Sequence, residues 1–189
     1  MKIFALLVII CLSAFGQQPY QLNGAGSASG FPAYYGNFYD STNQTISDIT
    51  QSYVLKIGSN YNTNSGISIQ QPGNKITFSQ SGTYIINFSL QFQNTATASG
   101  NYNADVWFRK NNTDIEYSNS IFTIPNKSGS VNGALIGASF LMVTVNANDY
   151  IQIVWAGSTT SVSIATLAAQ SNPTVPITPG VIVGVYAIH

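Results

Sequence analysis

Few side chains of this protein could do chemistry, and the carboxylates are the first candidates. Asp114 and Glu116 form the closest pair, and residues two apart on a strand share a face. Such a pair could bind calcium or serve as the acid and base of a glycosidase. A solvated hairpin tip is the simpler interpretation, so we expect no cofactor, with calcium at these two residues as the alternative. The other carboxylates are isolated along the sequence: Asp40, Asp48, Asp105 and Asp149.

Other catalytic residue types are scarce. The sole histidine is His189, and the sole cysteine, Cys11, lies in an apolar N-terminal run. A Ser-His-Asp relay or a histidine metal cluster therefore cannot be assembled from this inventory. Arg109 and Lys110 follow two aromatic residues, but a single basic pair usually marks a solvated strand end. We expect a protein that is not an enzyme.

The composition is unusually poor in charge. Only 6% of the 189 residues are charged and the net charge is zero, whereas about 25% is ordinary for soluble domains. A basic footprint for nucleic acid is missing, and so is a charge that would steer the protein to anionic membranes. A neutral surface rich in tyrosine, asparagine and serine is typical of extracellular β-proteins and particle shells.

The N-terminus predicts export. Residues 1–16 combine Lys2, an apolar run over residues 3–15 and small residues near Gly16, which is the pattern of a signal peptide. The run is short for a membrane span, which needs about 20 residues. The alternatives are an uncleaved anchor, the only membrane contact we expect, or a buried oligomerisation arm. Residues 17–33 read as a flexible Gly/Ser/Pro linker, and residues 34–189 as one domain.

Alternating hydrophobicity marks the long segment NKITFSQSGTYIINFSLQFQ at residues 74–93. From Tyr84 to Phe92, every second residue is apolar, which indicates a strand with one face in a core. Ile76 and Phe78 repeat the alternation before Gly82, a turn residue. The segment therefore predicts a long antiparallel hairpin.

Further short strands are predicted along the rest of the domain, and no stretch sustains a helical period. About ten strands with regular turns indicate an all-β, two-sheet antiparallel jelly-roll sandwich. Prolines at 173, 176 and 179 predict a loop of polyproline-II type. The other predicted strands span residues 34–40, 52–57, 66–70, 104–110, 118–124, 133–145, 150–155, 162–167 and 181–188.

Two of these strands, residues 133–145 and 181–188, are apolar on both faces. A sandwich strand needs only one apolar face, so something must cover the other. Another copy of the same subunit is the expected cover, and loops of the same chain are the alternative. The residues we expect at a homotrimer interface are Leu135, Leu141, Val143, Val181, Val183, Val185, Tyr186 and Ile188.

Several elements follow one another in a recognisable order. They are an aromatic strand at 34–40, ITFSQSGTY at 76–84 before the long strand, NDYIQI at 148–153 and the apolar strand at 181–188. This order resembles the C1q/TNF-like jelly roll over residues 34–189. More narrowly, GNFYDSTNQT at 36–45, DVWFRKN at 105–111 and SNPT at 171–174 resemble C1q-like modules of phage and large-virus structural proteins. The resemblance implies a homotrimer, with the last strand near the threefold axis, used for non-catalytic binding or particle architecture.

The expected function is therefore that of a virion component, of capsid or tail-fibre type, that mediates assembly or attachment. Its place is the virion surface or the extracellular space. Partner contact, with a host-surface glycan or protein or with other particle components, is expected from uncharged residues of apical loops, which hydrogen-bond and stack. The alternative is a secreted bacterial adhesin or glycan-binding, lectin-like protein. The candidate contact residues are Tyr102, Asn103, Tyr117 and Asn119.

Overall fold

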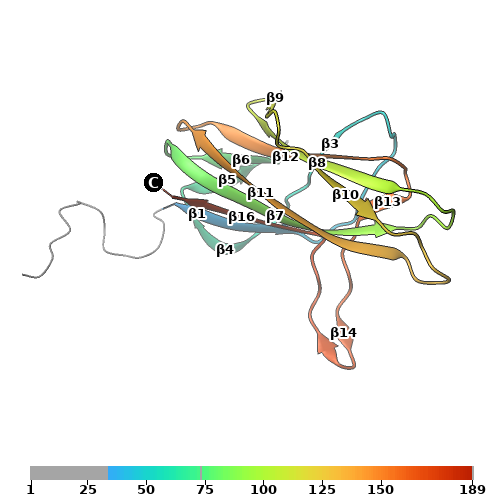
Figure 1. Cartoon of the computed structure of the whole chain (residues 1–189). Coiled ribbons are helices and arrows are strands. Elements are labelled where there is room, and N and C mark those ends of the chain that lie inside the picture. The colour runs from blue at the N-terminus through green and yellow to red at the C-terminus, as the bar shows by residue number, and fades with distance from the viewer. Residues whose placement is uncertain (1–33, 73, 189) are drawn as a thin grey trace, which may run out of the picture. The chain divides into compact units, whose positions relative to one another are not determined.

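The computed structural model describes residues 34–72 and 74–188. The expected signal peptide, the expected linker and His189 lie outside this range. Within it the chain forms two seven-stranded antiparallel sheets and one two-stranded sheet. The all-β two-sheet sandwich is thus confirmed (Figure 1). Over the same residues, no helix is long and apolar enough to cross a membrane.

The first sheet, sheet A, is built around its longest strand, β7 (Gly82–Asn94). β11 (Gly133–Val145) pairs with the whole length of β7 on one side. On the other side the order continues through β16 (Val181–Ala187) and β1 (Tyr35–Asp40) to β4 (Ser59–Ser65). The short strands β13 (Val162–Ile164) and β2 (Gln44–Thr45) complete this sheet beside the C-terminal end of β7.

The second sheet, sheet B, packs against sheet A. Its strand order is β10 (Ser120–Ile124), β8 (Tyr102–Lys110), β12 (Tyr150–Gly157), β6 (Lys75–Phe78) and β5 (Ile67–Gln70). Two short strands extend it, since β3 (Tyr53–Val54) pairs with β12 and β9 (Thr113–Asp114) pairs with β8. The two remaining strands, β14 (Gln170–Ser171) and β15 (Thr174–Val175), pair only with each other.

The core lies between the two sheets and is filled by the predicted alternation. Alternate β7 residues from Tyr84 to Phe92 are at most 3% exposed. They meet aromatic side chains of sheet B, as in the Phe88–Phe108 and Phe92–Trp155 pairs, whose ring centroids are 5.7 and 6.5 Å apart. Such pairs add to the stabilisation that apolar burial provides.

The predicted hairpin between β6 and β7 is wrong. β6 belongs to sheet B and β7 to sheet A, so the turn around Gly82 crosses from one sheet to the other. The alternating pattern fits a hairpin within one sheet and a crossing between two sheets equally well. In both cases the apolar residues of β6 and β7 point into the same core. Here Phe78 and Tyr84 face each other across the sandwich, with ring centroids 4.7 Å apart.

The proline-rich segment is a hairpin arm, which corrects the predicted polyproline-II-type loop. Residues 165–180 separate β13 from β16, and β14 and β15 pair within this segment. Below them, Leu167 and Thr178 exchange two backbone hydrogen bonds of 3.0 and 2.9 Å. We call residues 165–180 the arm; Figure 1 shows it projecting from the sandwich, marked by the β14 label.

Candidate binding and assembly surfaces

The outer face of β11 carries large apolar side chains that no described part of the chain covers. Ile136, Phe140 and Met142 are 63%, 67% and 55% exposed. They point outward because successive residues of a strand alternate between its two faces. The residues that alternate with them, such as Leu141 and Val143, pack against the core. Exposed apolar groups that lie close together mark interaction surfaces more often than scattered ones do.

This surface continues across β7 and β16. Phe140 lies opposite Asn87, and Met142 lies opposite Ile85, which in turn lies opposite Tyr186. The outward residues of these three strands are apolar or neutral and include no charged side chain. We call this surface the outer face of sheet A. A surface without charge can meet its own copy without like-charge repulsion.

The structure places most of the predicted trimer-interface residues on the core side of the same strands. Val181, Val183 and Val185 are at most 1% exposed and lie inside the subunit's own core. Leu135, Leu141 and Val143 are half-buried against that core. Tyr186 is 38% exposed on the outer face, and Ile188 is half-buried beyond the end of β16. The strand segments thus have the apolar outer face that we expected. Apart from Tyr186, however, residues of the opposite parity to the predicted ones form it, among them Ile136, Phe140 and Met142.

The Asp114–Glu116 pair does not form a shared strand face. β9 ends at Asp114, and Glu116 lies in the turn that follows. The Nε of Arg109 donates to Asp114 Oδ1 at 2.6 Å. This hydrogen bond, helped by one from Trp107, lowers the pKa of the Asp114 carboxyl below its ordinary 3.8. Among the described residues, no group of three or more His, Cys, Asp or Glu could hold a metal ion.

The four predicted contact residues are spread along one side of sheet B. Tyr102 and Asn103 begin β8, where the Tyr102 hydroxyl donates to the Ala98 carbonyl at 2.9 Å. Tyr117 is fully exposed in the turn before β10. Asn119 donates to Asp105 Oδ1 at 2.9 Å. Because Tyr102 lies opposite Ile124 while Asn119 precedes the opposite end of β10, the four residues do not gather at one apex.

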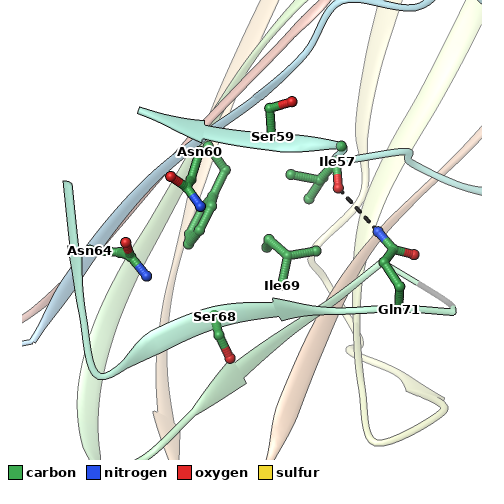
Figure 2. A pocket seen from close by; sticks show the side chains of 9 residues that line it. Ile57, Ser59, Asn60, Asn64, Ser68, Ile69 and Gln71 are labelled. Atoms are coloured by element: carbon green, nitrogen blue, oxygen red, sulfur yellow. Dashed lines mark hydrogen bonds between the residues drawn. The ribbon is translucent and has the colours of Figure 1, made fainter. Parts of the chain in front are cut away.

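A small uncharged pocket opens between β4 of sheet A and β5 of sheet B (Figure 2). Its volume is about 200 Å³, below the roughly 300–1,000 Å³ of most small-molecule sites. Figure 2 shows Gln71 donating to the Ile57 carbonyl, at 3.2 Å, across one end. Sequence reasoning missed this pocket because β4 has no apolar alternation. Its walls are Phe38, Ile57, Gly58, Ser59, Asn60, Asn64, Ser68, Ile69 and Gln71.

Sequence comparisons do not add a relative to this picture. Neither the comparison with protein-family models nor the search of curated proteins found a match to the chain.

Proposed function

We propose that this protein is a non-enzymatic, homotrimeric surface module of C1q/TNF-like type, and that it serves as a structural or attachment component of a virion. The observation that carries the proposal is the outer face of sheet A, where Ile136, Phe140 and Met142 are all more than half exposed. A second copy is the favoured cover because the face carries no charge that would select a partner of opposite sign.

The energetic argument is one of order of magnitude. Complete burial of one large apolar side chain stabilises by about 1.5–3 kcal/mol. Covering the exposed parts of these three side chains would then contribute on the order of 3–5 kcal/mol per copy, before the costs of association. The neighbouring apolar groups of β7 and β16 would add to this, and a stable assembly forms where the sum exceeds the roughly 4–15 kcal/mol that association costs.

The ion pair that Asp114 forms, within the closest carboxylate pair Asp114–Glu116, supports a non-catalytic role. Asp114 is already paired with Arg109, and its lowered pKa makes it a poor general acid near neutral pH. Neutral asparagine, serine and tyrosine side chains would instead contact partners by hydrogen bonding and stacking.

The mass of the full chain in solution, measured by light scattering, tests the assembly. A mass three times that of the chain is expected. Ile136→Lys should reduce the measured mass to that of the monomer and leave the circular dichroism spectrum unchanged. Ile121→Lys is the matched control, because Ile121 is 64% exposed on β10 of the other sheet and lies opposite Asp105, which favours a lysine there. A monomeric full chain would refute the proposal.

A second candidate function, a glycan-binding secreted adhesin, is supported by the pocket between β4 and β5. Asn60 and Gln71 offer amide groups there, which suit the hydroxyls of a neutral sugar. Titration with neutral oligosaccharides, followed by calorimetry, tests this candidate. Asn60→Leu, which replaces an amide of the pocket with an apolar side chain, should abolish the heat of binding, and Asn101→Leu in an exposed loop should not. No heat with the native chain would remove the candidate.

A further inference from the structure

The arm interrupts what is otherwise one continuous strand beside β7. Ile164 lies opposite Phe92, and Val181 lies opposite Leu90. Gln91 alone therefore separates the partners of β13 and β16 on β7, whereas the whole arm separates β13 from β16 along the chain. Gln91 bonds to both ends of the arm, since it accepts from the Ala165 amide at 2.8 Å and donates to the Gly180 carbonyl at 2.9 Å.

This position dictates the direction in which the arm leaves. Within the sheet, β7 occupies one side, and β2 and β1 occupy the other. On the inner face, Ile164 and Val181 are completely buried in the core. Among the described residues, the direction that these neighbours leave open is outward, from the outer face of sheet A. Figure 1 shows the arm extending on the side of β7 and β16, away from β8 and β12.

The arm has apolar side chains that the described part of its own subunit leaves exposed. Leu167, Val175 and Ile177 are 41%, 37% and 54% exposed, and every residue from 167 to 177 is exposed. The arm therefore does not lie down on its own sheet. Its base is fixed nonetheless, because Asn43 Oδ1 accepts from the Thr166 amide at 2.9 Å and Thr166 Oγ1 accepts from the Gly180 amide at 3.2 Å.

The arm and the exposed β11 face are close to each other and alike in chemistry. Ile136, on the outer face, lies directly opposite Gln91, the residue at the base of the arm. Residues 165–180, like the outer face itself, contain no charged side chain. A second copy cannot lie flat on this face without meeting the arm, which stands up from it. A second copy that binds to this face must therefore also contact the arm.

We propose that the arm is a clasp, which packs the apolar side chains of one copy onto the Ile136–Met142 stretch of β11 of a second copy. The inference rests on the self-association proposed above and assigns the element that makes it. The contact joins two different patches, arm and β11 face, so it is heterologous, and heterologous contacts that close form rings. A closed trimer would use each arm once.

A shortened arm tests the clasp. Leu167 and Thr178 form a hydrogen-bonded antiparallel pair, which a two-residue Asn-Gly loop can close. Residues 168–177 are therefore replaced by Asn-Gly in the full chain. Sedimentation at a series of concentrations should show self-association weakened at least tenfold, with an unchanged circular dichroism spectrum. If the native chain associates and the shortened chain associates equally well, the clasp is refuted while the assembly stands. If the native chain is monomeric at all concentrations, both proposals fail.

Disulfide trapping gives a second test that does not depend on the shortened chain folding. Cys11 is the only native cysteine, so Cys11→Ser provides a background without thiols. In it, a Val175→Cys chain and a Phe140→Cys chain are mixed under reducing conditions and then oxidised. Peptide mass spectrometry should find the arm of one chain linked to β11 of the other, in at least tenfold excess over a Val175→Cys and Ile121→Cys mixture. Equal yields from the two mixtures would overturn the proposal.

Discussion

The Lys110 ammonium lies 3.0 Å from a carboxylate oxygen of Asp149, and this pair joins the turn after β8 to the turn between β11 and β12. The same carboxylate accepts from the Asn146 amide at 2.8 Å and from Asn111 Nδ2 at 2.7 Å. Asp149 therefore shapes its own turn and holds the neighbouring turn against it. Its side chain is only 14% exposed, which limits screening by solvent.

The pH dependence of stability should show this cluster. The Asn146 amide, followed by Asn111 and Lys110, lowers the pKa of Asp149 from its ordinary 3.8 to about 2. Because the folded-state pKa is the lower one, the contribution to stability is present above about pH 4 and is lost as the pH falls towards 2. Urea unfolding between pH 6 and pH 2 should show the free energy of unfolding falling over this window.

Asp149→Asn is the control for that experiment. It should lower the free energy of unfolding by about 1–2 kcal/mol at pH 6, and it should flatten the decline below pH 4. An equally steep decline in the variant would show that other carboxyls, and not Asp149, dominate the acid response.

Val183→Asp should unfold the subunit and not merely dissociate an oligomer. Val183 is completely buried, opposite Phe88 on β7, so the new carboxylate would enter the core without a partner. Breaking a core in this way costs several kcal/mol, which is a large part of the stability of an ordinary domain. Circular dichroism should show loss of the β signal. A folded monomer would instead place Val183 at an interface.

Gly133, the first residue of β11, should be intolerant of even one added carbon. A Cβ there would overlap the backbone carbonyl of Pro125. This carbonyl accepts a hydrogen bond from Asn94 Nδ2, so it cannot move aside without disturbing that bond. Gly133→Ala should lower the melting temperature by roughly 2–4 °C for each kcal/mol lost in a domain of this size, and overpacking typically costs about 1–3 kcal/mol. Gly100→Ala is the control, because its Cβ would make only ordinary contacts of 3.5 Å or more.

The amino-acid pattern predicts the core strands well because burial of one parity leaves a clear signal. β11 has the predicted bounds, and β1, β6, β7, β8, β12 and β16 lie within a few residues of theirs. β4 could not be predicted in the same way. Its sequence, SNYNTNS, is polar throughout, because it pairs with β1 alone and has neither face in the core. Pairing between backbones does not require an apolar side chain, so such edge strands leave no periodic signal.

Parity explains why the surface was harder to predict than the strands. In β11 and β16 both parities are apolar, so hydrophobicity alone cannot say which one faces the core. The valines of β16 point inward opposite Leu90, Phe88 and Ile86. The arm was missed for a related reason. Its prolines indicate a break in regular structure. They do not indicate that the chain then returns to the same side of β7, so that β13 and β16 flank Gln91.

Calcium should leave the stability of the protein unchanged. Asp114 is paired with Arg109 at 2.6 Å, and Glu116 lies exposed in the next turn. A calcium ion would have to displace this ion pair and would gain few oxygen ligands, whereas calcium takes six to eight. Millimolar calcium and its removal by chelator should therefore give the same melting temperature, within about 1 °C. Asp114→Asn should lower the free energy of unfolding only slightly, by about 0.2–1 kcal/mol, as exposed ion pairs do. A calcium-dependent rise in melting temperature that Asp114→Asn and Glu116→Gln both abolish would establish a metal site at this turn.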